Sequence, residues 1–499
     1  MKTRILTTSV IAALALSVTS CNMDLRPYGT IEPDNALQTI DDAQRLRNGL
    51  YVFMRSYSGG VFANRDEVRS DEFHALASFG NNGGNVYNWI VTSADSDPQS
   101  IWGGSYQTIA NANFFIEKAR AVNTEEWSEE DKANLQLWMG EAFFFRAYYH
   151  LELAENFCLD YVGNEQSLGI PYMTVYNPTS DQSQYPSRPT LEETFANIMA
   201  DIDSAAKYVT TPGAVGSMWV TADAVTALRA RAALECGDYQ TAFSAASSLL
   251  PTYPLVAADT AEFRKMWHED SGKECILQLT GSYPNEVPTS FDFSYLGYTH
   301  GQGFRPSYVP EQWVLELYTN LNPQDMRYTV LMRQDSANVS GTDYMMYMFN
   351  KFPGNPALRQ SISSMNYAHK PKIFRIGEMY LICAEAAQRG GLGDPWTYIN
   401  QLRESRIPGY TGGGSGDALT EILNERVREL IGEGFRIQDL KRFHVDLQRR
   451  AAQIPETIYL PETNQDFFRS YTHYQMTWPI PQAEIYANPH IQQNPGYAE

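Results

Sequence analysis

The 499-residue chain contains few cysteines and few basic residues, and both shortages narrow its possible functions. Its five cysteines have neither the paired spacing of a zinc site nor the density of a disulfide scaffold. There are 38 Lys and Arg residues against 58 Asp and Glu residues, which gives a formal net charge of −20. No basic run concentrates positive charge, so nucleic acid would meet net repulsion. We therefore expect no binding to nucleic acid.

Long hydrophobic runs are also missing, except for one at the N-terminus. Two basic residues precede an apolar segment over 5–16, which is too short to cross a membrane but suits an export signal. The segment leads into Val18-Thr19-Ser20-Cys21, which resembles a bacterial lipobox, whose cysteine thiol receives diacylglycerol. We expect residues 1–20 to be a lipoprotein signal peptide and Cys21 to be the lipidation site. The alternative is an ordinary signal peptide with an incidental cysteine.

Familiar catalytic signatures are absent from the sequence. It has no Walker A loop, no HExxH motif, no GxSxG elbow and no dinucleotide-binding glycine fingerprint. Asp95-Ser96-Asp97 has the first spacing of a calcium loop, but the other ligand positions are missing, and turn formation explains it equally well. We expect no catalytic residues, no metal site and no cofactor. Two carboxylates distant in sequence could still form a glycosidase pair, so a lipid-anchored glycoside hydrolase remains an alternative.

The remaining cysteines are far apart, and we expect them to be small buried hydrophobic residues. One disulfide is the alternative in an exported protein. The four positions are Cys158, Cys236, Cys275 and Cys383.

Helical periodicity dominates what is present. Apolar residues recur at steps of three and four over 131–157, 372–389 and 417–431. Two segments within 222–249 carry small residues at helical spacing on either side of Gly237-Asp238-Tyr239, and the pair looks like a tetratricopeptide unit. We therefore predict a mainly α fold with a degenerate tetratricopeptide-like solenoid as its scaffold. The scaffold is expected mainly over 40–57, 101–250 and 370–445.

Two long irregular regions, 58–100 and 251–370, separate the helical blocks. Loops this long are uncommon in a compact domain unless they have a function. Both regions contain aromatic residues beside polar ones. Such a surface suits a sugar ring, which offers an apolar face for stacking and hydroxyl groups for hydrogen bonds. The alternative is that these aromatic residues pin the loops onto the scaffold.

Several short motifs follow one another in a specific order along the chain. They are Trp102-x-x-x-Tyr106-x-x-Ile109-x-x-x-Asn113, Glu141-Ala142-x-x-x-Arg146-Ala147-Tyr148-Tyr149, the segment 375–386, Ile399-Asn400-x-x-Arg403, Glu425-Arg426-x-x-Glu429-Leu430-x-x-Glu433-Gly434-x-Arg436-x-x-Asp439-Leu440-x-Arg442, Pro479-Ile480-Pro481-x-x-Glu484-Ile485-x-x-Asn488-Pro489 and Gln493-Asn494-Pro495-Gly496-Tyr497. The ordered set resembles the SusD/RagB-type nutrient-binding outer-membrane lipoproteins of Bacteroidetes. Two pairs depart from the usual pattern, Ile431-Gly432 and Ile437-Gln438, which concerns packing more than function.

The resemblance implies one SusD-like domain over 21–499, with four tetratricopeptide-like helix pairs and variable loops. It implies a lipoprotein anchored in the outer membrane and facing the cell exterior. Such a protein captures nutrients, usually glycans, and delivers them to a SusC-like TonB-dependent barrel without catalysis. Some relatives act in peptide uptake, so a peptide ligand is the alternative.

The resemblance also suggests where the ligand binds. In relatives whose glycan sites are understood, contacts come from the loop ahead of the first motif and from the middle region, which correspond to 58–100 and 251–370. The candidate ligand-binding residues are Asp71, Asn81 and Trp89 in the first loop and Tyr295, Tyr298 and Arg305 in the second.

The charged C-terminal motif has a structural explanation. Its charged residues recur at steps of three and four, so ion pairs can link one helix to its neighbours. These residues are Glu425, Arg426, Glu429, Glu433, Arg436 and Asp439.

Overall fold

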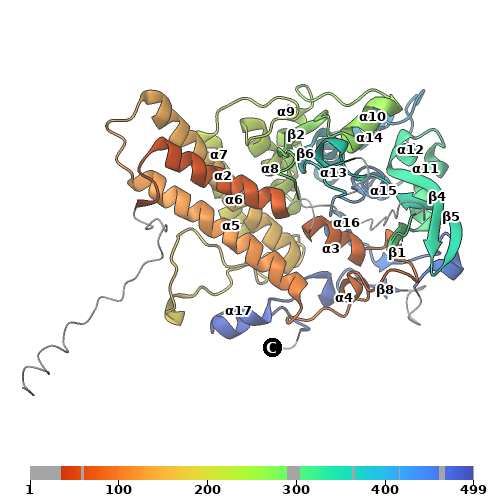
Figure 1. The fold of residues 1–499 in the computed structure, drawn as a ribbon, viewed down its shortest axis with the longest axis horizontal. Coiled ribbons are helices and arrows are strands. Elements are labelled where there is room, and N and C mark those ends of the chain that lie inside the picture. The colour runs from red at the N-terminus through yellow and green to blue at the C-terminus, as the bar shows by residue number, and fades with distance from the viewer. Residues whose placement is uncertain are drawn as a thin grey trace, which may run out of the picture.

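The computed structural model describes residues 35–57, 61–288, 304–361, 366–414, 416–459 and 467–497. Within these ranges the chain forms α-helices α2 to α17 and a few short strands, which confirms the predicted mainly α fold (Figure 1). The longer helices are α2 (Ile40–Tyr57), α5 (Ser96–Ala121), α6 (Glu129–Phe157), α7 (Leu191–Tyr208), α8 (Ala222–Glu235), α9 (Tyr239–Leu249), α13 (Ile376–Gly390), α14 (Pro395–Glu404) and α15 (Ala418–Leu430).

These helices form a continuous row of packed neighbours. Helix α2 packs on α5 and α6, and from α6 the contacts pass through α7 and α8 to α9. Helix α9 packs on α13, which also contacts α14 and α15. Figure 1 shows α2, α5, α6 and α7 side by side at one end of the molecule, and α11, α12, β4 and β5 at the other. Because each helix covers the apolar surface of the next, the row has the character of a solenoid.

The starts of the scaffold helices follow from the sequence. Ser128 caps α6 by accepting a hydrogen bond from the backbone N–H of Asp131. Thr190 and Glu193 form a reciprocal capping box at the start of α7. The predicted break between α8 and α9 is present, since Gly237 has a φ of 74° and Asp238 caps α9. The predicted helix pair in 222–249 is therefore confirmed.

The remaining elements are shorter, and most of them lie in the two regions that were predicted to be irregular. The short helices are α3 (Val61–Arg69), α4 (Gly84–Tyr87), α10 (Thr260–His268), α11 (Gln312–Leu321), α12 (Met326–Leu331), α16 (Arg436–Phe443) and α17 (Gln482–Ala487). The strands are β1 (Phe73–Ala75), β2 (Cys275–Gln278), β3 (Tyr308–Pro310), β4 (Met332–Val339), β5 (Thr342–Phe349), β6 (Lys372–Arg375), β7 (Leu447–Gln448) and β8 (Phe468–Arg469). The irregular regions thus contain helix α3 and the β4–β5 hairpin, which the sequence patterns did not predict.

The strands form two-stranded antiparallel pairs that join distant segments. Strand β1 pairs with β3, with Phe73 opposite Pro310 and Ala75 opposite Tyr308. Strand β2 pairs with β6, and β7 with β8. Only β4 and β5 form a local hairpin among the described strands, closed at Val339 and Thr342. The β1–β3 pair holds the two predicted ligand loops together.

The described cysteines are free thiols. Cys158, Cys275 and Cys383 are buried, and Cys236 is half-buried, in line with the expected role as small hydrophobic residues. Cys21 and the signal segment lie outside the described residues. No helix in the described part of the chain is both long enough and apolar enough to span a membrane.

Candidate functional site

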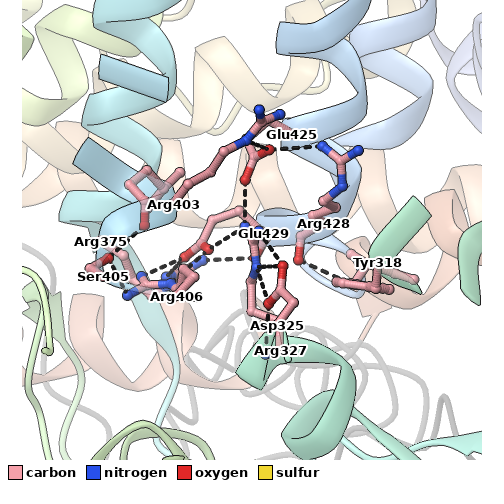
Figure 2. Close-up of polar contacts among 12 residues, drawn as sticks. Tyr318, Asp325, Arg327, Arg375, Arg403, Ser405, Arg406, Glu425, Arg428 and Glu429 are labelled. Carbon is pink, nitrogen blue, oxygen red and sulfur yellow. Dashed lines mark hydrogen bonds and ion pairs between the residues drawn. The ribbon is translucent and has the colours of Figure 1, made fainter. Parts of the chain in front are cut away.

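The charged C-terminal motif forms a buried ionic network, shown in Figure 2. Glu429 lies at its centre on α15, and its carboxylate oxygens accept hydrogen bonds from Arg406 at 2.9 and 3.0 Å. The same oxygens accept a hydrogen bond of 3.0 Å from Arg375, at the end of β6. They accept another of 3.3 Å from Arg327, which lies on α12. All four side chains are almost completely buried. The network therefore joins α12, β6 and the end of α14 to α15.

One turn away, Glu425 has the same type of environment. It accepts from Arg327 at 2.7 Å, from Arg403 on α14 at 2.9 Å and from Arg428 at 2.8 Å. Burial alone would raise the pKa of Glu425, but the guanidinium groups of Arg327 and Arg403 hold it well below its usual value. These carboxylates are ionised and paired. The predicted role of the motif, ion pairs that link one helix to its neighbours, is confirmed.

Two of the predicted ligand-binding residues are buried. The Asp71 carboxylate is 1% exposed and forms two hydrogen bonds with Arg436, at 2.7 and 2.9 Å. The Trp89 side chain is 4% exposed, and its indole N–H donates to the carbonyl oxygen of Arg69 at 2.9 Å. The Trp89 ring packs against Phe467, with centroids 5.8 Å apart. Asp71 and Trp89 therefore shape the first loop from within rather than presenting a stacking face to solvent.

The other aromatic residues of the loops follow the same pattern where they are described. Tyr87 and Tyr308 are buried with ring centroids 5.6 Å apart, and the Arg449 guanidinium lies 3.7 Å from the centre of the Tyr87 ring. For these residues the alternative interpretation holds, since they pin the loops onto the scaffold. Tyr295 and Tyr298 lie outside the described residues.

Asn81 and Arg305 are both exposed. Asn81 adopts a left-handed conformation, with a φ of 59°, which asparagine tolerates better than most residues. Its neighbour Asn82 donates a side-chain hydrogen bond to the hydroxyl of Ser307 at 3.1 Å, and Ser307 lies two residues after Arg305. Asn81 and Arg305 thus lie one and two residues from the contact that joins the two loops, on a surface that we call the Asn81 rim.

Further bonds support this rim. The Tyr308 hydroxyl donates to the carbonyl oxygen of Asn82, and the backbone N–H of Leu76 donates to the carbonyl oxygen of Ser307 at 2.9 Å. With the β1–β3 pair, these contacts make the facing edges of the two loops a single surface. No local sequence pattern predicts this pairing, because the two segments are short and lie more than 200 positions apart.

Asp95 and Asp97 both have partners within the protein. Asp95 precedes α5 and accepts hydrogen bonds from Thr92 and from Asn85, while Asp97 pairs with Arg65 at 2.7 Å. These contacts fit the turn-forming interpretation. Among the residues that the structure describes, no group of three or more His, Cys, Asp or Glu side chains has a geometry that could hold a metal ion.

The interior also contains a polar cavity of about 80 Å³ between α6, α8 and α16. Glu152, Glu155 and Glu235 line it, together with Arg231 and Gln438. Burial, followed by repulsion from Glu152 and Glu235, raises the pKa of Glu155 well above its usual value. A polar space of this size holds a few water molecules. It is too small for a saccharide and belongs to the scaffold.

Comparisons with known proteins agree with this architecture. Two family models match the chain: the SusD family over residues 285–497, and a family described as starch-binding associating with outer membrane over residues 28–234. No curated protein matched the sequence.

Several solved structures share the fold. A SusD superfamily protein from Bacteroides thetaiotaomicron is 24% identical, with a TM-score of 0.77 over 92% of this chain and 100% of its own. A SusD-like carbohydrate binding protein from Bacteroides vulgatus is 18% identical, with a TM-score of 0.71 over 91% of this chain and 98% of its own. A laminarin binding SusD-like protein is 19% identical, with a TM-score of 0.67 over 92% of this chain and 100% of its own. The structures share the fold of this chain, and because the two family matches together span most of its sequence, the chain belongs to the SusD family.

Proposed function

We propose that this protein is a cell-surface lipoprotein of the outer membrane that binds an oligosaccharide or polysaccharide and delivers it to a SusC-like TonB-dependent transporter. The observation that carries the proposal is the rim where the two long loops meet on a SusD-family scaffold. Structural relatives described as carbohydrate binding and laminarin binding support a glycan as the ligand.

The proposed activity is binding without cleavage of the glycan. A micromolar site, worth about −8 kcal/mol, is strong enough to capture a polymer from the medium. It also releases its ligand on a timescale that suits transfer to a transporter. The extensive pairing of the buried carboxylates described above fits a scaffold that holds loops in place.

Asn81 and Arg305 are the residues at this rim that we propose contact the ligand. Tyr295 and Tyr298 remain proposed contacts, since they precede Arg305 by no more than ten positions in the sequence. Asp71 and Trp89 would act on the ligand only through the shape of the first loop, because both are buried.

Affinity electrophoresis in gels that contain a panel of neutral polysaccharides tests the proposal. The wild-type protein should be retarded by at least one polysaccharide, and Asn81→Ala and Arg305→Ala should each weaken that retardation while the fold is unchanged. Arg45→Ala on α2 is the matched control, because that arginine is 75% exposed and pairs only with nearby Asp42 among the described residues. Equal retardation of all variants would remove the rim from the proposed site.

A second assay separates binding from catalysis. The purified protein is incubated with the polysaccharide that retards it, and the products are analysed by chromatography. Unchanged polymer is the expected result. Released oligosaccharides would instead support the glycoside hydrolase alternative and would contradict the proposal of a pure binding protein.

A further inference from the structure

A second surface hollow, separate from the Asn81 rim, has the chemistry of a binding site. Its volume is about 410 Å³, and it lies between α10, α12 and the β4–β5 hairpin. The polar residues of its lining are Arg264, His268, Thr329, Arg333, Gln334 and Asn350. Ligand sites in proteins begin at about 300 Å³, so the hollow can accept one or two sugar rings.

The charge of this hollow is opposite to that of the protein. The chain has 20 more acidic than basic side chains, yet two arginines and no acidic residue line the hollow. Arg264 is exposed and forms no hydrogen bond or ion pair with the described residues. His268 adds no charge at neutral pH, because burial and the nearby Arg264 guanidinium lower its pKa to about 4.

The second arginine of the hollow, Arg333, packs against a buried aromatic ring. The Arg333 guanidinium carbon lies 4.5 Å from the centre of the Phe304 ring, and Phe304 is 7% exposed. Arg333 also pairs with Asp335 at 2.5 Å, but both side chains are well exposed. Exposed ion pairs of this kind contribute little free energy, so an incoming anion can displace the Asp335 carboxylate.

Phe304 also connects the hollow to the proposed glycan site. It forms a parallel bridge with Ala337 on β4, and its carbonyl oxygen accepts a hydrogen bond from the backbone N–H of Asn338 at 2.8 Å. Arg305, the next residue, lies on the rim described above. Phe304 therefore contacts Arg333 at the hollow and precedes Arg305 of the rim in the chain, so this one residue links the two surfaces.

We propose that this hollow is a subsite for an anionic sugar, with a carboxylate or a sulfate ester as the group that Arg264 and Arg333 recognise. The planar fork of a guanidinium group matches both anions and forms strong charge-assisted hydrogen bonds. Thr329, Gln334 and Asn350 supply neutral hydrogen-bonding groups for the sugar hydroxyls. The proposal rests on the glycan-binding function and names the class of glycan.

The test compares polymers that differ only in charge. Polygalacturonate carries a carboxylate on each ring, and its fully methyl-esterified form has the same backbone without the charge. Dextran sulfate and dextran form the corresponding pair for sulfate. We expect the wild-type protein to bind at least one charged polymer more tightly than its neutral counterpart, and Arg264→Gln and Arg333→Gln each to weaken this binding about tenfold.

Two further variants make the test specific. Arg120→Gln is the matched control, because Arg120 is an exposed arginine on α5, an element that contributes no residue to this hollow or to the Asn81 rim. It should leave binding of the charged polymer unchanged. Asp335→Asn should strengthen binding, because it releases Arg333 from its competing carboxylate. Circular dichroism should show the same melting temperature for every variant at these exposed positions.

The outcomes separate this inference from the proposed function. Preference for polygalacturonate assigns the carboxylate, and preference for dextran sulfate assigns the sulfate. Retention of neutral polysaccharides without any preference for charged polymers would overturn the anionic subsite but leave the glycan-binding function intact. Charged-polymer binding that Arg264→Gln and Arg333→Gln do not weaken would also overturn it. No retention of any polysaccharide would contradict both proposals.

Discussion

Single residues in this protein show how differently a carboxylate behaves according to its partners. Glu429 is 1% exposed and faces three guanidinium groups, from Arg327, Arg375 and Arg406. Pairing with the guanidinium groups offsets the cost of burying this carboxylate charge. Removal of the carboxylate leaves the guanidinium groups buried without a compensating charge. Glu155 lacks such a ring of cations and lies beside two more carboxylates. The two residues therefore respond in opposite ways to loss of their charge.

Glu429→Gln should destabilise the protein by about 3–5 kcal/mol, because it leaves buried guanidinium groups without their carboxylate. Urea unfolding followed by circular dichroism measures the free energy of unfolding. Glu129→Gln is the control, since the Glu129 side chain is 90% exposed in its pair with Lys132 and should leave the unfolding midpoint unchanged. A Glu429→Gln variant as stable as wild type would contradict the structural role of the network.

Glu155→Gln should stabilise the protein at pH 8, and the gain should shrink towards pH 5. The raised pKa means that the folded state binds a proton that the unfolded state releases. The wild-type protein therefore loses stability as pH rises through the folded-state pKa of Glu155. The Glu155→Gln variant does not, because its amide group does not titrate. Free energies of unfolding measured at several pH values check this. A gain that is equal at both pH values would contradict the raised pKa.

The sequence predicted the charged C-terminal motif better than it predicted the ligand-binding residues. Steps of three and four place charges on one helix, and this regularity is visible without a structure. The burial of Trp89 cannot be seen in the sequence, because it depends on contacts with Arg69 and Phe467, which come from other segments. Asn81 and Arg305 were proposed only from the region in which they lie, and no local pattern indicated that Ser307 would lie beside that region. The sequence did not indicate that Arg264 and Arg333 line one hollow, since they come from separate elements.

Secondary-structure elements were predictable where one face of a helix is apolar. Helices α6, α8, α9, α13 and α15 all follow their periodic residues. Helix α3 was missed because Asp66, Glu67 and Arg69 are charged and yet buried, so no apolar stripe marks the inner face. Strand β4 was missed because four polar residues follow one another over 333–336, which hides the alternation of a strand. Tertiary contacts override local propensity in both cases.

Thr190→Ala should lower the stability of the protein by about 1 kcal/mol, because it removes the hydroxyl that accepts from the Glu193 backbone N–H at the start of α7. Thr190→Ser keeps the hydroxyl and should retain most of the stability. Thermal unfolding of the three proteins measures the difference. The same loss in both variants would show that the methyl group, and not the cap, is responsible.

The β4–β5 turn offers a test of the hairpin that carries Arg333. Ser340 and Gly341 have φ values of 52° and 92°, so the two-residue turn requires left-handed conformations at both positions. Gly341→Ala should destabilise the hairpin by about 1 kcal/mol, whereas Ser340→Asn should be tolerated or stabilising. Hydrogen exchange of the β4 and β5 amides reports on the hairpin itself. Unchanged exchange in Gly341→Ala would contradict the turn geometry.

At the level of the whole molecule, the described part of the chain holds no membrane-spanning helix, and the proposed attachment depends on Cys21. Cys21→Ser should move the protein from the membrane fraction to the soluble fraction, because acyl chains supply about 0.8 kcal/mol per buried methylene. Detergent extraction and labelling with a radioactive fatty acid measure the change. Membrane retention of the unlabelled variant would point to an ordinary signal peptide and a protein partner.

The short β1–β3 pair has a consequence for anyone who redesigns this protein. Since segments more than 200 positions apart share backbone hydrogen bonds, replacing either loop alone by that of a relative would leave unmatched edges. A transplant of specificity between family members would have to exchange both stretches together, as one cassette. Chimeras that carry a single foreign loop should fold poorly, and those that carry the matched pair should inherit the donor's preference.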